Sequence, residues 1–231
     1  MFKQFFAVAA LATLPMAAQA TTLDFDGPND TAIFSGPNVL VGYIVGDREF
    51  SFSQITTSGQ VSSGANLFDS LACTNNTTPL VAACGGNDDG DLVPQVQGEN
   101  GVYGNILIRQ QASATLDDDA AGNGSLLMTL TSGPAFTLEG FSAIDGSIIS
   151  LFHNNVQFFG PVNDRGNRET AQYNTLSVSP IFNVGDTLRV QLLGSGGVDS
   201  FQLAAIPLPA GGLLLAAAFG GLAFVRRRKT A

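Results

Sequence analysis

The sequence contains no tryptophan and a single histidine, and charged residues make up only 13% of its 231 positions. A disordered charged tail is excluded, because 45% of the residues are hydrophobic. Nucleic-acid binding is also excluded, since ten basic residues face 19 acidic ones and phosphate neutralisation needs the opposite excess. The composition therefore indicates a folded, acidic protein.

Lysine is absent between Lys3 and Lys229. The middle of the chain has five bases, all arginine, against all 19 acids, which gives it a formal charge of −14. A domain with this charge attracts cations and is repelled by polyanions and anionic membrane surfaces.

The residues needed for common catalytic sites are missing. Acyl-transfer triads need a base beside a nucleophile, but the only histidine, His153, lies in an expected turn, and no G-x-S-x-G motif occurs. No phosphate-binding glycine loop leads into a helix. Among 19 acids, a pair at a separation suited to glycoside hydrolysis is expected by chance and carries no weight. We predict no catalytic residues and no enzymatic activity.

The first 20 residues have the three parts of a secretory signal peptide. Lys3 precedes the apolar stretch Phe5–Leu14, and small residues follow at Ala18 and Ala20. Ten apolar residues are too few to span a bilayer, which argues against a permanent anchor. We predict that signal peptidase cuts after Ala20 and that the mature chain begins at Thr21.

The other end of the chain carries a long uncharged stretch, Leu203–Val225. Counted from Pro207, it would form a helix about 28 Å long, close to the ~30 Å of a hydrocarbon core. It has no polar face, unlike a helix of a soluble core. The sequence therefore predicts one transmembrane helix at about 207–225. Four basic residues follow the helix directly: Arg226, Arg227, Arg228 and Lys229. By the positive-inside rule they stay on the cytoplasmic side of the membrane, so they serve as the stop and orientation signal.

A proline motif begins this tail and consists of Ile206, Pro207, Leu208, Pro209 and Ala210. Together with the apolar helix and the basic cluster, it resembles the VPLPA variant of the PEP-CTERM sorting signal over residues 205–230. The family usually has valine at the position of Ile206. In that family an exosortase, a polytopic membrane cysteine protease or transpeptidase, recognises the tail. The resemblance implies a single-pass inner-membrane precursor with a periplasmic ectodomain, which then reaches the cell surface or extracellular matrix.

Residues 21–204 show apolar alternation with period two, separated by Gly, Asn, Asp or Pro clusters, and no sustained helical period up to residue 200. His153-Asn154-Asn155 is typical of a tight hairpin. The expected strands are Val39–Val45, Glu49–Ile55, Asn105–Arg109, Ser125–Thr131, Ala135–Phe141, Ser147–Phe152, Val156–Phe159, Thr175–Ser179, Thr187–Leu193 and Val198–Leu203.

This pattern predicts an all-β ectodomain, a two-sheet, jelly-roll-like β-sandwich over residues 21–204, followed by the sorting segment 205–231. A closed barrel has the same period-two pattern and stays an alternative. The segments Tyr103–Ile108, Leu116–Ser125 and Gly194–Val198 resemble a β-sandwich ectodomain common on exosortase-anchored bacterial proteins. That resemblance supports the fold and a surface role, and implies no activity.

The two cysteines, Cys73 and Cys84, lie eleven positions apart. In an exported protein an even pair of this kind predicts one disulfide that closes a loop. Zinc ligation is disfavoured, since two cysteines and one distant histidine cannot complete a structural site.

Two acidic clusters, 87–91 and 117–119, offer carboxylates at alternate positions of expected loops. They make Asp89, Asp91, Asp117 and Asp119 candidate calcium ligands, since calcium takes six to eight oxygens. Neither cluster fits the EF-hand spacing, and solvated acidic turns are the favoured alternative. No other cofactor is expected.

A carbohydrate-binding module for exopolysaccharide, with or without calcium, is the alternative function, because such modules often have sandwich folds. Sugar recognition usually depends on exposed aromatic rings. With no tryptophan in the sequence, the candidates for this role are Tyr43, Tyr103 and Tyr173. We expect most phenylalanines to lie in the core instead. The main prediction is an exported structural or interaction protein of the cell surface.

Overall fold

The computed structural model describes residues 20–28, 30–36, 39–56, 58–69, 104–109, 123–144, 148–163, 172–194 and 196–206. Ala20–Ala205 forms one compact unit. All regular structure among the described residues is β-strand, as predicted. Within this part of the chain, no helix has the length and hydrophobicity needed to cross a lipid bilayer. The helix expected at about 207–225 lies outside the described residues.

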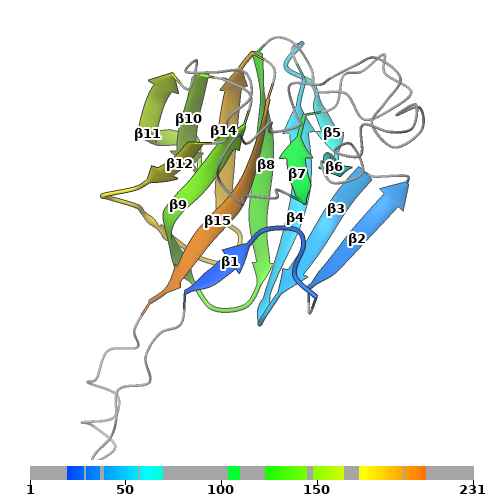
Figure 1. Ribbon diagram of the computed structural model, residues 1–231, viewed down its shortest axis with the longest axis vertical. Coiled ribbons are helices and arrows are strands. Elements are labelled where there is room, and N and C mark those ends of the chain that lie inside the picture. Colours follow the sequence, from blue (N-terminus) through cyan, green and yellow to red (C-terminus); the bar gives the residue numbers. More distant parts are fainter. Residues whose placement is uncertain are drawn as a thin grey trace, which may run out of the picture. The chain divides into compact units, whose positions relative to one another are not determined.

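Fifteen strands are present among the described residues (Figure 1). They are β1 (Thr21–Leu23), β2 (Thr31–Gly36), β3 (Val39–Val45), β4 (Arg48–Ile55), β5 (Val61–Ser63), β6 (Ala65–Asp69), β7 (Asn105–Ile108), β8 (Asn123–Ser132), β9 (Phe136–Ile144), β10 (Ile148–His153), β11 (Val156–Asn163), β12 (Gln172–Thr175), β13 (Ile181–Phe182), β14 (Thr187–Leu193) and β15 (Gly197–Ala205).

These strands form one curled antiparallel sheet in the order β11-β10-β14-β8-β4-β3-β6-β7-β15-β9-β12. Four further strands pair outside this order: β1 with β15, β2 with β3, β5 with β4 and β13 with β9. We expected two separate sheets. Instead, β6 pairs with both β3 and β7, so the two halves of the sheet stay hydrogen-bonded to each other.

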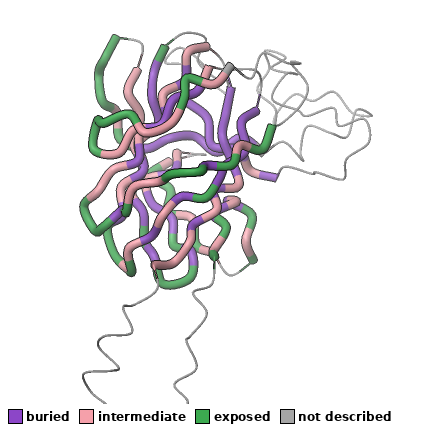
Figure 2. The backbone as a smooth tube through the Cα atoms, turned by 90° about the vertical axis from the view of Figure 1, so that its left-hand side faces the viewer, coloured by how far each residue is buried: buried purple, intermediate pink, exposed green. Residues whose placement is uncertain are grey.

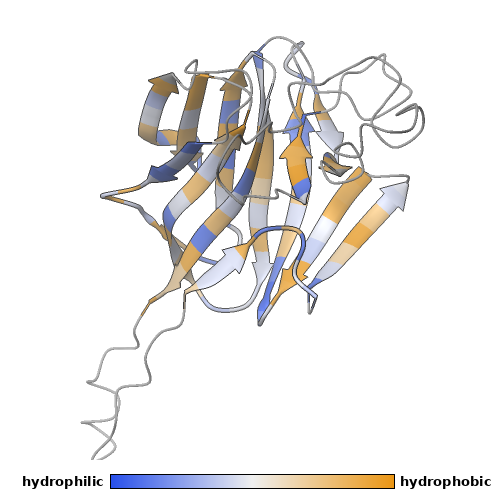
Figure 3. Ribbon diagram, in the orientation of Figure 1, coloured by the Kyte–Doolittle hydropathy of each residue, from blue (hydrophilic) through white to orange (hydrophobic). Residues whose placement is uncertain are grey.

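The core lies between the two halves of the curled sheet. Phe50 of β4 meets Phe136 of β9 edge-on with ring centroids 5.8 Å apart, and Phe141 of β9 meets Phe159 of β11 at 5.7 Å. Figure 2 shows the buried backbone inside and the exposed backbone around it. Hydrophobic and hydrophilic residues alternate along β14 (Figure 3), which lets one face of this strand be buried. The second half of β9, residues 140–144, is buried at every position.

Most expected strands are present, and β3 and β14 have the predicted bounds. The prediction for Thr175–Ser179 is wrong, since β12 ends at Thr175. The physical reason lies at Ser179: its hydroxyl, instead of a strand carbonyl, accepts the hydrogen bond from the Leu138 N–H at 2.9 Å. Side-chain bonding of this kind competes with a backbone ladder.

The hairpin predicted at His153-Asn154-Asn155 is confirmed between β10 and β11. Asn154 and Asn155 have φ of 47° and 70°. Two-residue hairpin turns of type I′ need positive φ at both central residues, and asparagine tolerates this conformation better than most residues.

Candidate functional site

The two ends of the β unit lie together. β1 and β15 are antiparallel neighbours, and Thr21 lies opposite Leu203. Ala20, the residue before the expected signal-peptide cut, is exposed and directly precedes β1. Ile206, the first residue of the expected sorting motif, is half-buried and directly follows β15. Both predicted processing positions therefore adjoin the same pair of strands.

The other predicted site residues lie outside the described residues, so their roles stay predictions. They are Ala18, Cys73, Cys84, Asp89, Asp91, Asp117, Asp119, Pro207, Leu208, Pro209, Ala210, Arg226, Arg227, Arg228 and Lys229.

The tyrosines proposed for sugar stacking have different surroundings. Tyr43 is only 2% exposed, packs edge-on against Phe25, and donates its hydroxyl to Asp30 Oδ2 at 3.2 Å. The prediction for Tyr43 is therefore wrong, because its position on β3 turns the ring into the core. Tyr103 lies outside the described residues. Tyr173 on β12 is 43% exposed.

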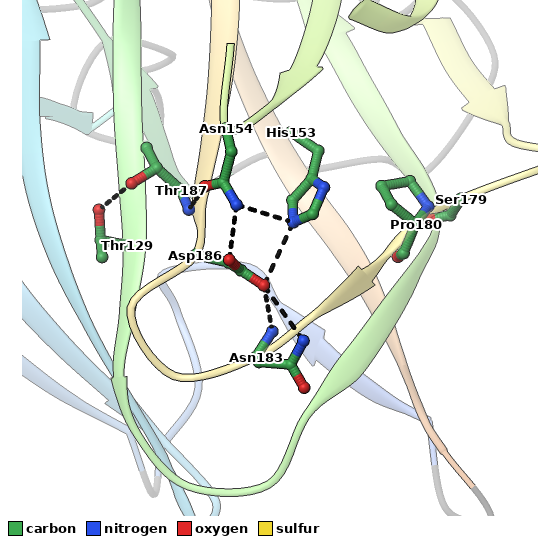
Figure 4. Close-up of polar contacts among 8 residues, drawn as sticks. All are labelled: Thr129, His153, Asn154, Ser179, Pro180, Asn183, Asp186 and Thr187. Carbon is green, nitrogen blue, oxygen red and sulfur yellow. Dashed lines mark hydrogen bonds and ion pairs between the residues drawn. The ribbon is translucent and has the colours of Figure 1, made fainter. Parts of the chain in front are cut away.

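One polar cluster joins the β10–β11 turn to the turn before β14 (Figure 4). Asn154 Nδ2 donates to Asp186 Oδ1 at 2.6 Å, and the Asn183 backbone N–H donates to Asp186 Oδ2 at 2.8 Å. His153 Nε2 lies 3.2 Å from the same Oδ2. These hydrogen bonds, led by that of the Asn183 backbone, hold the pKa of Asp186 well below its usual value.

Among the described residues, no hydroxyl or thiol is hydrogen-bonded to His153. The Thr187 hydroxyl is hydrogen-bonded to that of Thr129 at 2.8 Å, and the Ser179 hydroxyl is bonded to backbone groups. The His153 ring lies edge-on to Phe182, with centroids 4.7 Å apart. The arrangement joins two turns. The prediction that His153 is a turn residue is wrong by one position, since His153 is the last residue of β10 and the turn consists of Asn154 and Asn155.

A second polar cluster was not predicted from the sequence. Its residues come from distant segments: Asp24, Asp26 and Asp30 from the connection between β1 and β2, Asn105 from β7, and Asp199 from β15. Asp26 Oδ1 accepts hydrogen bonds from the Asn105 backbone N–H at 2.9 Å and from Asn105 Nδ2 at 2.8 Å. The alternating acids of Leu23-Asp24-Phe25-Asp26 are visible in the sequence, but their proximity to Asp199 is a consequence of strand pairing.

Asp199 is the buried member of this cluster, with 2% of its surface exposed. Its Oδ2 accepts a hydrogen bond from Ser200 Oγ at 3.0 Å, while its Oδ1 is buried without a hydrogen-bond partner. Burial raises the pKa of Asp199 to about 7, and the charges of Asp26 and Asp24 act in the same direction. Burial likewise raises the pKa values of Asp26 and Asp30, again with a contribution from Asp24.

Chemically, this cluster offers carboxylate oxygens and one buried, unsatisfied acceptor. Among the described residues, no three acidic, histidine or cysteine side chains already converge on a position that would hold a metal ion. Compared with family models, curated proteins and solved structures, the chain shows no significant match to any of them.

Proposed function

We propose that this chain is an exported cell-surface or extracellular-matrix protein with a structural or interaction role, processed by an exosortase-type enzyme. Three segments support the proposal: the signal peptide ending at Ala20, the motif Ile206–Ala210 and the uncharged stretch that ends before Arg226. Signal peptidase removes the first segment, and the helix at about 207–225 holds the precursor in the inner membrane with a periplasmic ectodomain. We propose a jelly-roll-like sandwich as the complete ectodomain fold.

The observation that carries this proposal is the position of the two ends of the β unit. β1 begins directly after the expected signal-peptide cut, and β15 ends one residue before the sorting motif. Cuts after Ala20 and near Pro207 would therefore remove no strand residue. A domain whose ends are paired neighbours can lose both flanking segments and keep its sheet complete.

Intact-mass measurement of the protein recovered from the cell surface tests both cuts at once. We expect a chain that begins at Thr21 and ends near Pro207–Ala210, with the mass of any attached group added. A surface protein that retains residues 1–20, or retains the apolar segment through Val225, would contradict the proposal.

Substitution of the motif sharpens this test. The double variant Pro207→Ala/Pro209→Ala should keep the N-terminal cut and lose the C-terminal one, so that the precursor accumulates in membranes. Pro180→Ala, outside the motif, is the matched control and should be processed normally. Equal C-terminal cleavage of the two variants would show that the processing enzyme does not recognise the proline motif.

The membrane anchor has its own test. The precursor should stay with membranes in alkaline carbonate, because an uncharged segment of this length is most stable across a bilayer. Replacing Arg226–Lys229 with glutamines should disturb its orientation or retention. Release of the unchanged precursor by carbonate would refute the anchor.

Exopolysaccharide is the second candidate partner, and one observation favours it. Tyr173 is 43% exposed on β12, at the end of the strand order. An exposed aromatic ring can stack on a sugar ring. Tyr173→Ala should lose binding to polysaccharide from the producing cells, whereas Val178→Ala, also at an exposed position, should keep it. Binding by both variants would exclude this surface.

A further inference from the structure

The end of β15 lies within a short reach of the segment expected to span the membrane. β15 ends at Ala205, and that segment begins two residues later at Pro207. Two residues of extended chain reach at most about 7 Å. The headgroup layer on each side of a bilayer is about 5–7 Å thick. Since the proposed function places Pro207 at the edge of the hydrocarbon core, the end of β15 lies at the level of the headgroups.

Strand register shows which residues share this level. Phe136 of β9 pairs with Ala205 on one side and with Phe182 of β13 on the other. Ile181 directly precedes Phe182, and two strand spacings, about 10 Å, separate it from β15. β13 and β15 are both antiparallel to β9, so they run in the same direction. The chain that follows Phe182 therefore continues towards the expected membrane.

Two turns lie at this end of the β unit. In the turn after β13, the Asp186 N–H donates to the Asn183 carbonyl oxygen at 2.9 Å, and Val184 lies between these two residues. The β10–β11 hairpin lies beside this turn (Figure 4), because His153 Nε2 is 3.2 Å from Asp186 Oδ2. Val156, the first residue of β11, pairs with His153. Val156 and Val184 thus belong to neighbouring turns.

Exposed aliphatic side chains gather around these turns. Val178 joins them through its neighbour Ser179, whose hydroxyl accepts a hydrogen bond from Leu138, the partner of Leu203 on β15. Exposed apolar residues that gather in one place, unlike singly scattered ones, indicate an interaction surface. Four of the five most exposed large hydrophobic residues in the described part of the chain form this group, which we name the apolar rim: Val156, Val178, Ile181 and Val184, 49–75% exposed.

The rim is also uncharged. Residues 147–163 and 175–185, which contain its four members, include no acidic or basic residue other than His153, although the middle of the chain has a formal charge of −14. Asp186 follows the second segment directly, but its carboxylate accepts hydrogen bonds from Asn154 and Asn183 and is only 20% exposed. The surface is therefore suited to an apolar or neutral partner.

The opposite side of the same end is acidic. Arg48 Nη1 donates to Thr21 Oγ1 at 3.5 Å, and Thr21 pairs with Leu203 near the end of β15. Asp47, the residue before Arg48, has a side chain that is 73% exposed. A carboxylate in this position is most stable in water, so a membrane would contact the apolar side of this end and not the side of Asp47.

We propose that the apolar rim contacts the bilayer surface of the anchored precursor, among the headgroups of neutral phospholipids, with the β unit tilted towards β11 and β13. This inference rests on the proposed function through its membrane helix. Aliphatic side chains gain free energy on leaving water, and an anionic surface would repel the acidic domain. The short connection from Ala205 to Pro207 makes the contact intramolecular in effect, so that even a weak contact is populated.

The absence of tryptophan allows a direct test, since one introduced tryptophan reports only its own surroundings. The full chain is reconstituted into phosphatidylcholine vesicles with and without bromine on the acyl chains near the headgroups. Emission from Val184→Trp and from Val156→Trp should shift to the blue and be quenched by the brominated lipid. Equal emission from these variants in the two kinds of vesicle would overturn the proposal.

The matched control is Val61→Trp. Val61 is 67% exposed and pairs with Ile55 at the far end of β4, whose first residue is Arg48. The seven steps along β4 place it about 23 Å from the rim end. Its emission should be the same in both kinds of vesicle. Quenching of Val61→Trp as strong as that of Val184→Trp would show that the domain has no preferred contact, and would also refute the rim.

Acidic substitutions show whether the rim makes the contact. In the Val184→Trp protein, Val178→Glu/Ile181→Glu should abolish the quenching, because a carboxylate resists transfer out of water. Val61→Glu in the same protein should keep it. Both positions of the double variant are exposed, so its melting temperature should hardly change. If the double variant does not fold, Val178→Glu alone, at 75% exposure, should still weaken the quenching. Undiminished quenching in the folded variant would refute the proposal.

Extraction in alkaline carbonate separates this inference from the proposed function. A chain that stays with the vesicles, but shows no quenching at Val184→Trp, refutes the rim contact and leaves the anchor intact. A chain that carbonate releases refutes both. A blue shift without quenching, found only when several chains share a vesicle, would show that a second copy covers the rim in place of lipid.

Discussion

Asn154 and Asp186, 32 positions apart in the chain, are joined by a hydrogen bond of 2.6 Å from the Asn154 amide to the Asp186 carboxylate. The Thr187 backbone N–H completes the link by donating to Asn154 Oδ1 at 2.9 Å. Asn154, which adopts the positive φ that the hairpin turn needs, thus also fixes the turn that leads into β14. The β10–β11 hairpin and the start of β14 are held as one element by these side chains.

Removing the shared acceptor should loosen this element. Asp186→Ala deletes the acceptor of the Asn154, Asn183 and His153 side chains and should lower the free energy of unfolding by about 1.5–3 kcal/mol, the range for hydrogen bonds to a charged group. Urea unfolding measures the loss. Asp47→Ala, at an exposed aspartate, is the control and should change stability by less than about 0.5 kcal/mol. Equal effects of the two substitutions would show that the cluster contributes no stability.

The same carboxylate predicts a dependence on acid. The pKa of Asp186 is lowered from its ordinary value of 3.8 in the folded protein. Its contribution to stability is therefore complete above pH 3.8 and is lost as the pH falls through the folded-state pKa. The stability difference between the unchanged protein and Asp186→Asn should be constant near neutral pH and shrink in that acidic window. A stability difference that stays constant down to pH 2 would show that the ionised Asp186 carboxylate does not stabilise the fold.

Alternating burial with period two is the feature of a strand that a sequence shows most directly. β14, with alternate residues Leu188, Val190 and Leu192 buried, is an example and was predicted with its true bounds. The short strands β1, β5 and β13 contain two or three residues each, too few to show a period. They exist because a neighbouring strand offers a free edge, which is information from the tertiary structure.

Of the two polar clusters, one could be predicted from local sequence and the other could not. The hairpin at Asn154-Asn155 follows from local turn chemistry, and the sequence predicts it. The burial of Asp199 depends on the bulge in β15 and on β7 and β1 pairing on either side of it. Composition indicated an acidic domain that attracts cations, but not which acids the fold would gather.

The aromatic contacts across the core predict where stability is concentrated. Phe136 is 1% exposed, stacks on Phe182 at 5.0 Å and meets Phe50 from the opposite half of the sheet. Phe136→Ala should therefore lower the free energy of unfolding by about 3–5 kcal/mol. The control is Phe34→Ala on β2, because that side chain is 47% exposed and loses less contact. Similar losses for both would mean that the halves of the sheet do not share one core.

Gly133, in the turn between β8 and β9, gives the sharpest steric prediction. Its φ is 103°, and an added Cβ would lie close to the Asp47 carbonyl oxygen and 2.8 Å from the Arg48 Cα, both rigid backbone atoms. Gly46 also has a positive φ, 59°, but a Cβ there would meet nothing within 4 Å. Gly46→Ala should cost only the backbone strain, about 1–2 kcal/mol. Gly133→Ala adds the clash and should cost clearly more, measured as the difference between the two midpoints in urea. If the two variants are equally stable, the turn can move away from β4, and the close approach of these backbones is not required by the fold.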